Sequence, residues 1–194
     1  MATIAPFRAV RPRPELASQV AAPPYDVVSL QEARDLAEGN PYCFLRIGRA
    51  ELELGDGVDP YSAEVYQRGA DNLRRLIQDG VLVQELQPLL GVYRQKWGQH
   101  VQTGIVALAS VDEYDRGLIR KHEKTRPDKV KDRTDHILAV GAQTGLIFLA
   151  FRNTDKIRDL IAETVKSEPL YDFVAIDGVK QTVWRGPDEL VEAF

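Results

Sequence analysis

Hydrophobic residues recur at helical spacing in several stretches of the chain, each with a recognisable start or stop. The first covers residues 30–38, where Ser29 and Glu32 form a capping box ahead of the apolar positions. The clearest covers residues 60–79, with Asp59 as the expected cap. The same spacing predicts further helices over 128–143, over 154–167 and from Pro187 onwards.

Shorter apolar or alternating runs predict strands. Two pairs of runs flank tight turns, at Gly98-Gln99 and at Asp177-Gly178, and therefore predict two hairpins. Their strands are expected over 89–97 and 100–111, and over 171–176 and 179–184. Residues 41–48 and 146–151 are also predicted to be strands, the second buried because it is apolar throughout.

These elements together favour an α+β fold. Helices and antiparallel hairpins alternate without a regular βαβ pattern, which predicts a mixed, largely antiparallel sheet with flanking helices. With 194 residues, 44% of them hydrophobic, the chain is long enough to bury a core of its own. We therefore expect residues 1–194 to form a single globular unit.

Composition narrows the location and the chemistry. No apolar stretch is long enough to cross a bilayer, and the N-terminus lacks an apolar signal core, so we expect a cytoplasmic protein without a membrane partner. Cys43 is the only cysteine, which excludes an internal disulfide and a cysteine-based zinc site. Because Cys43 lies in an apolar run, a buried, inert thiol is a better interpretation than a catalytic one.

A basic segment stands out against this background. The whole chain carries a net charge of −4, but residues 116–136 contain eight lysines and arginines against four acidic residues. A local cationic region on an acidic protein is typical of an anion site, most simply for phosphate. The acidic balance argues against a general nucleic-acid coat protein, although the basic segment remains able to contact nucleic acid.

Residues 116–143 are therefore the main candidate site, in a loop that leads into the predicted helix. His122 and Glu123 are candidates for an acid/base pair, with the carboxylate taking a proton from a hydroxyl. The candidate phosphate ligands are Lys121, Lys124, Thr125, Arg126, Lys129 and Arg133. A charge run is equally typical of a solvated surface, and the residue types alone do not separate the two interpretations.

Within that helix, Lys129, Asp132, Arg133 and His136 have the spacing of one face. Asp132 and His136 are four residues apart, which also suits a pair of metal ligands, but no metal site is assigned on a single pair.

Two further candidate sites lie near the first predicted helix, one before it and one after it. Tyr25 and Asp26 follow Pro23-Pro24, so either a packed turn or a ring and carboxylate for a ligand is expected. Arg46 alternates with apolar residues in the predicted strand 41–48 and requires a solvated face, a carboxylate or a ligand.

Several motifs are absent from the sequence. It has no phosphate-binding P-loop, dinucleotide fingerprint, nucleophile elbow or HExxH zinc motif, and no repeated aromatic-basic interleaving of the RNA-binding kind.

Four short runs of the chain resemble the bacterial and archaeal family catalogued as domain of unknown function 1015. These runs are Pro23-Pro24-Tyr25-Asp26-Val27-Val28, Asn40-Pro41-Tyr42 with Phe44-Leu45-Arg46-Ile47, Arg120-Lys121-His122-Glu123-Lys124-Thr125, and Lys131-Asp132-Arg133. Their order and spacing match over most of the chain, and the run from Arg120 to Thr125 is the most specific.

The resemblance implies that this chain is the N-terminal portion of a longer protein, with the remaining C-terminal portion as its partner. Family members carry an Asp-Gly-His-His-Arg motif beyond the last residue here. That motif is similar to one in the ParB/sulfiredoxin-like group, which includes ADP-dependent free-serine kinases.

Our hypothesis is a phosphoryl-transfer enzyme acting on a small hydroxylated metabolite such as serine, with ADP or ATP and Mg²⁺. Glu123 is the expected base, His122 orients or donates, and the cations neutralise phosphate charge, while Tyr25, Asp26 and Arg46 line the pocket. The alternative is a ParB-like module that binds a nucleotide or nucleic acid without turnover.

Overall fold

The computed structural model describes residues 2–122 and 124–194, and the chain forms two compact units. The described part of unit 1 comprises residues 2–14, 84–122 and 149–194, and unit 2 comprises Glu15–Val83 and Lys124–Phe148. The two units are described separately, and the expectation of a single globular unit stays a prediction.

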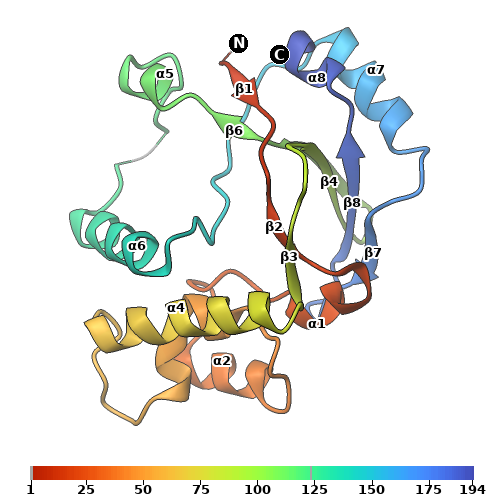
Figure 1. The fold of residues 1–194 in the computed structure, drawn as a ribbon. Coiled ribbons are helices and arrows are strands. Elements are labelled where there is room, and N and C mark those ends of the chain that lie inside the picture. Colours follow the sequence, from red (N-terminus) through yellow and green to blue (C-terminus); the bar gives the residue numbers. More distant parts are fainter. Residues whose placement is uncertain (1, 123) are drawn as a thin grey trace. The chain divides into compact units, whose positions relative to one another are not determined.

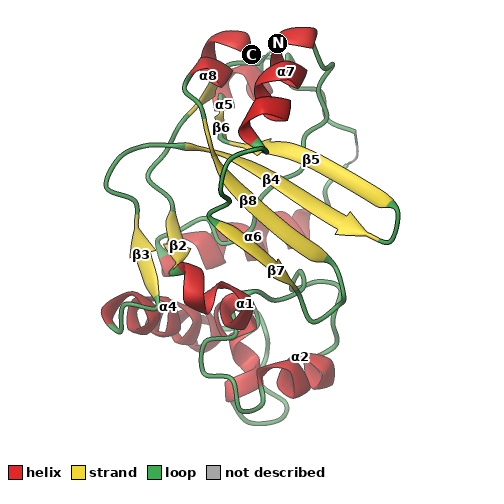
Figure 2. Ribbon diagram, turned by 90° about the vertical axis from the view of Figure 1, so that its right-hand side faces the viewer, coloured by secondary structure: helices red, strands yellow, loops and turns green. Residues whose placement is uncertain are grey.

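Unit 1 is built on a four-stranded antiparallel sheet in the order β5-β4-β8-β7 (Figure 2). These strands are β4 (Leu90–Trp97), β5 (His100–Val106), β7 (Tyr171–Val174) and β8 (Lys180–Gly186). Both predicted hairpins are present, since β4 pairs with β5 and β7 pairs with β8. A second antiparallel pair joins β1 (Ile4–Ala5) to β6 (Leu108–Ala109).

Helices cover the core of unit 1. They are α7 (Asp155–Thr164) and α8 (Glu189–Ala193), which lie next to β8 in Figure 1. The unit also contains α5 (Val111–Asp115), which buries none of its residues. The core consists of strand residues such as Leu90, Val92 and Trp184 and helix residues such as Ile157 and Leu190, all buried. Burial of these apolar side chains is the main stabilising contribution to the unit.

Unit 2 is helical. Its helices are α1 (Ala17–Val20), α2 (Leu30–Ala37), α3 (Leu45–Gly48), α4 (Ala63–Gln78) and α6 (Pro127–Val140), with the 3₁₀ turn η2 (Ala50–Glu53). The remaining short elements of the chain are β2 (Val10–Pro12), η1 (Pro14–Leu16) and β3 (Leu82–Gln84). In Figure 1, α6 lies alongside α4.

Two apolar clusters hold unit 2 together. Val20, Ile47, Leu73 and Leu76 belong to the first, and Ala33, Ala37, Cys43 and Leu45 belong to the second. Helix α3 contributes to both clusters, so it joins α4 on one side to α2 on the other. Cys43 is buried as expected, and burial raises the pKa of its thiol.

The predicted α+β class, antiparallel hairpins and flanking helices are confirmed. Helix α2 has the expected capping box, in which Ser29 N donates to Glu32 Oε2 at 2.7 Å and Glu32 N donates to Ser29 Oγ at 3.2 Å. Helix α4 starts three residues later than predicted, because Ser62 caps it whereas Asp59 accepts from Tyr61 N within the preceding turn. Helix α6 ends at Gly141, which has a positive φ of 73° and takes the place predicted for Gly145.

Two predicted strands are wrong. Residues 41–48 form a turn and α3, because the Asn40 side chain accepts from Tyr42 N at 3.0 Å and Cys43 and Ile47, one helical turn apart, are both buried. Residues 146–151 belong to no strand, and Leu146, Ile147 and Phe148 are 72–75% exposed. An apolar run becomes a strand only where a neighbouring strand takes its backbone hydrogen bonds.

Among residues 2–122 and 124–194, no helix combines the length and the apolar composition that a bilayer span needs.

Candidate functional site

Helix α6 carries the C-terminal half of the basic segment, and one of its faces is largely buried. Asp132 and His136 are buried, and Arg133 and Lys129, one turn apart, are both partly buried. The spacing inferred from the sequence is therefore the face by which α6 packs within unit 2. Pro127 occupies the first turn, where its missing N–H costs no hydrogen bond.

The buried part of that face is a polar network. Tyr66, on α4, donates from its hydroxyl to Asp132 Oδ1 at 2.9 Å. His136 Nε2 lies 3.1 Å from the carbonyl oxygen of Ile47 on α3, and its ring meets Tyr66 edge-on at 6.1 Å. Burial and the bond to Asp132 raise the pKa of Tyr66, so the phenol stays protonated and acts as the donor. The network fixes α6 against α3 and α4.

Arg133 bridges this network and the Tyr25 loop. Its Nε and Nη2 donate to the two carboxylate oxygens of Asp132, each at 3.0 Å, and its guanidinium lies 4.1 Å from the ring centroid of Tyr25. A planar guanidinium held by a carboxylate and stacked on an aromatic ring has a well-defined position. Tyr25 and Arg133, both predicted site residues, are therefore brought together.

Arg49 sets the position of the Tyr25 loop. Its Nη1 donates to the carbonyl oxygens of Tyr25 at 3.0 Å and Val28 at 2.7 Å, while its Nε pairs with Glu51 at 2.6 Å. The proline pair and these bonds make the segment a packed turn, as one of the two interpretations of the sequence proposed. Asp26 follows Tyr25 in this turn and is exposed.

Lys129 lies against a second tyrosine. Its Nζ donates to Tyr61 Oη at 3.0 Å and lies 5.4 Å from the ring centroid. The hydrogen bond from the ammonium to the hydroxyl raises the pKa of Lys129, so the side chain is charged. Tyr61 is half-exposed, so this cation and ring face solvent at the surface of unit 2.

The remaining candidates of the basic segment are more exposed. Arg126 pairs with Asp128 at 2.7 Å and thereby lowers the pKa of that carboxyl group, and Lys124 and Thr125 lie in the preceding loop. Lys121 belongs to unit 1, where its Nζ lies 4.4 Å from the ring centroid of Tyr114, and His122 is in the same unit. Glu123, the predicted base, lies outside the described residues.

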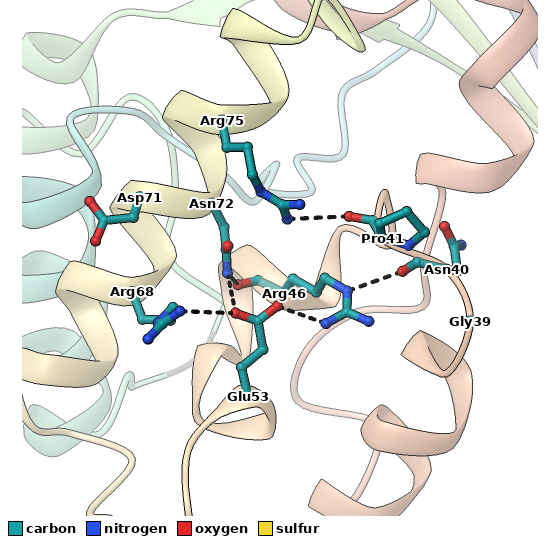
Figure 3. Close-up of a pocket in the computed structure, with 9 residues that line it drawn as sticks. All are labelled: Gly39, Asn40, Pro41, Arg46, Glu53, Arg68, Asp71, Asn72 and Arg75. Carbon is teal, nitrogen blue, oxygen red and sulfur yellow. Dashed lines mark hydrogen bonds and ion pairs between the residues drawn. The ribbon is translucent and has the colours of Figure 1, made fainter.

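Arg46 pairs with a carboxylate, one of the three environments considered for it from the sequence. It lies on α3, where it donates to Ala37 O at 2.6 Å and, as Figure 3 shows, to Asn40 O at 3.0 Å and Glu53 Oε1 at 2.7 Å. Its side chain is only 20% exposed. A partly buried arginine needs such a carboxylate partner, so Arg46 closes the turn after α2 and pairs with Glu53.

One comparison with known proteins identifies the family. A family model described as a protein of unknown function, DUF1015, matches residues 4–193. The chain belongs to the DUF1015 family. A search of curated proteins and a search of solved structures each found no match for it.

Sequence reasoning missed three residues of the candidate site. Tyr61 and Tyr66 were expected only as part of the helix 60–79, and Arg49 was not singled out. The two tyrosines themselves were the available signal for a site. A buried phenol needs a hydrogen-bond partner, and an exposed one offers its ring to a cation. Nothing in the sequence paired either ring with the basic segment about 65 residues later.

The magnesium ion expected with the nucleotide stays a prediction. Among residues 2–122 and 124–194, no group of three or more histidine, cysteine or acidic side chains is placed to hold a metal. The carboxylates nearest to Lys129 along α6, Asp128 and Asp132, are each engaged by an arginine. No step of the proposed chemistry is therefore assigned to a metal.

Proposed function

We propose that the DUF1015 chain binds a phosphate-bearing small molecule at the N-terminal half of α6, where Lys129 and Arg133 are partly exposed, as the binding side of a phosphoryl-transfer, kinase-like enzyme. The observation that carries this proposal is the placement of Lys129 and Arg133, on adjacent turns of α6, against Tyr61 and Tyr25. The cytoplasmic location expected from the sequence is part of the proposal.

The two cations have different tasks in this proposal. No carboxylate of the described residues lies within ion-pair distance of Lys129, so its charge is available to a ligand. Arg133 shares its charge with Asp132, and it contributes fixed N–H donors more than net charge. Lys124 and Arg126, at the start of α6, add positive charge at the same end.

The surface also suits the other end of a nucleotide. Tyr61 is 50% exposed and offers a planar ring on which a base can stack, next to the cation that would meet a phosphate. A bound ADP or ATP would supply the phosphoryl group. Lys129 would neutralise negative charge that develops on the phosphate oxygens, and Arg133 would orient them.

The acid/base roles rest on the sequence. Glu123 is proposed as the base that takes the proton of a substrate hydroxyl, such as that of serine, and His122 as the group that orients or donates. The proton would pass from the hydroxyl oxygen to the carboxylate as that oxygen attacks the terminal phosphorus atom of the nucleotide, while the bond from that atom to the bridging oxygen breaks and releases AMP from ADP or ADP from ATP.

A second candidate function is binding without turnover, which the tyrosine–cation pairs also favour. A nucleic acid would contact several phosphates and lose affinity steeply as salt rises, whereas a single nucleotide would lose less. Titrating the chain with ADP, ATP and a short single-stranded oligonucleotide at two salt concentrations separates the two ligand classes.

The test of the site compares Lys129→Gln with Lys131→Gln, which changes an exposed lysine of the same helix that pairs with Asp135. Loss of a charge-assisted hydrogen bond is worth about 1.5–3 kcal/mol, so we expect Lys129→Gln to weaken nucleotide binding about tenfold or more. Lys131→Gln should bind as the unchanged chain does. Calorimetry measures both.

Turnover is tested by following phosphoryl transfer from ADP or ATP to serine, with Glu123→Gln as the variant. This change should abolish transfer and leave nucleotide affinity nearly unchanged. Equal nucleotide affinity of the two lysine variants would contradict the α6 site, and transfer that survives in Glu123→Gln would contradict the role of the carboxylate.

A further inference from the structure

Unit 2 contains an open pocket that neither the basic segment nor the proposed nucleotide surface uses. It has a volume of about 720 Å³ and lies between the turn Gly39–Pro41 and the side of α4 that carries Arg68 and Arg75 (Figure 3). Its floor is α3 and η2, through Arg46 and Glu53.

The floor is rigid. Arg46 pairs with Glu53 at 2.7 Å, and the buried Asn72 side chain donates to Arg46 O at 2.7 Å and to Glu53 Oε2 at 3.0 Å. Both hydrogens of the Asn72 amide are therefore used, and both oxygens of Glu53 are occupied. A carboxylate that is already satisfied in this way repels an incoming anion less than a free one.

The walls hold two loosely engaged arginines. Among the described residues, Arg68 has one ionic contact, at 3.9 Å from Glu53, and Arg75 has one hydrogen bond, at 3.4 Å to Pro41 O. Each guanidinium has five N–H donors, so most of the donors of both side chains remain available. Arg68 and Arg75 are seven residues apart, and with Asn72 they lie on one side of α4.

The charge balance of the pocket favours an anion. Three arginines face it against Glu53 and Asp71. Asp71 is engaged by Arg74 and by Gln67 Nε2, and Figure 3 shows its carboxylate turned away from Glu53 and Arg46. The local charge within the pocket is therefore positive, in a chain whose net charge is −4.

We propose that this pocket is a second, separate binding site for a small molecule that carries two anionic oxygen groups, either a diphosphate or a dicarboxylate. Arginine binds phosphate and carboxylate with two parallel N–H bonds. The two arginine backbones are about 10 Å apart along the helix axis, and each guanidinium offers its own paired N–H donors, so one small tetrahedral anion uses these donors less fully than two linked anionic groups do. A two-headed anion places one end on each guanidinium.

The experiment titrates pyrophosphate, glutarate and orthophosphate into the isotope-labelled chain and follows the arginine side-chain N–H signals by NMR. Saturable shifts of the Arg68 and Arg75 signals are expected with pyrophosphate or glutarate, and whichever binds more tightly identifies the class of head group. Orthophosphate is expected to bind at least about tenfold more weakly, because it loses one charge-assisted contact.

Variants distinguish anion binding in this pocket from binding elsewhere on the surface and from binding at α6. The double variant Arg68→Ala/Arg75→Ala should lose binding, and Arg68→Lys/Arg75→Lys should retain charge but bind more weakly because lysine lacks the paired donors. Arg158→Ala is the matched control, since Arg158 is an exposed arginine of α7 that pairs with Asp155 and does not line the pocket. Lys129→Gln should leave pyrophosphate binding at Arg68 and Arg75 unchanged.

Three results would overturn the proposal: no saturable shift with either two-headed anion, equal affinity for orthophosphate, or the same loss in Arg158→Ala as in the double variant. None of these results bears on nucleotide binding at Lys129, so the proposals for the two sites are tested independently.

Discussion

At the scale of single residues, the burial of His136 makes the stability of the chain depend on pH. Its side chain is buried, its Nε2 faces the carbonyl oxygen of Ile47, and the groups around it are Asp132, Arg133 and the Tyr66 ring. Burial is the largest influence and lowers the pKa of His136 below its ordinary value of about 6.5. The folded chain therefore holds this imidazole neutral, as a donor to the carbonyl.

The lowered pKa predicts a pH dependence of stability. Below about pH 6.5 the unfolded chain binds a proton at this position more readily than the folded chain, so the free energy of unfolding should fall as the pH drops. The loss should grow until the pH passes the folded-state pKa. Urea unfolding between pH 7.5 and pH 5, at about half-unit steps, measures the free energy of unfolding at each pH. The same series on His136→Gln gives the contribution of the other titrating groups, and the difference between the two series is the contribution of His136.

His100→Gln is the control for that series, because His100 lies exposed beside the β4–β5 turn. The His100 variant should keep the pH dependence of the unchanged chain, and the His136 variant should show a flatter one. Parallel curves for all three proteins would mean that His136 does not sense pH.

At the scale of elements, the packing of α3 against α4 depends on one glycine. A Cβ at Gly69 would lie 2.7 Å from the carbonyl oxygen of Ile47, closer than real Cβ atoms approach a backbone atom. The two neighbouring carbonyls of α3 are both used by other helices, Arg46 O by Asn72 of α4 and Ile47 O by His136 of α6. A shift of α3 would therefore disturb the polar network and the pocket floor together.

Gly69→Ala is accordingly expected to destabilise unit 2. Overpacking typically costs about 1–3 kcal/mol, and alanine recovers up to about 1 kcal/mol of helix propensity, so the net loss should be about 1–2 kcal/mol. Chemical denaturation followed by circular dichroism measures it. Gly55→Ala is the matched change, because nothing lies within 4 Å of a Cβ built at Gly55; a neutral result at both positions would show that α3 moves freely.

At the scale of the whole molecule, each unit has its own buried core. Leu76 is 1% exposed in the core of unit 2, and Val92 is fully buried in that of unit 1. Both tryptophans of the sequence, Trp97 and Trp184, belong to unit 1, and Trp184 is buried there. Tryptophan fluorescence therefore reports on unit 1, while the helices of unit 2 contribute to the circular dichroism.

Leu76→Ala should separate the two signals. Removing a buried leucine side chain costs about 2–5 kcal/mol. We expect the unfolding midpoint seen by circular dichroism to fall while that seen by tryptophan fluorescence stays nearly unchanged, and Val92→Ala should have the opposite effect. If both midpoints fall together in each variant, the chain unfolds as the single cooperative unit that its sequence was expected to form.

The sequence by itself determined those elements whose signals are local. The α2 capping box, the two hairpin turns and the spacing of Lys129, Asp132, Arg133 and His136 on α6 follow from residues within a few positions of one another. Membership of the DUF1015 family was likewise readable from short runs. Caps, turns and helical periodicity act through neighbouring residues, so they need no knowledge of distant parts of the chain.

Tertiary structure alone decided what those elements do. Cys43, Leu45 and Ile47 alternate as in a strand, but partners from α2 and α4 bury them as part of a turn and a short helix. The apolar run 146–151 has the composition of a buried strand and lies exposed. Tyr25 meets Arg133, and Tyr61 meets Lys129, across 108 and 68 residues. Such pairings depend on which distant groups satisfy a backbone, a charge or a ring, and that information is not local to any stretch of sequence.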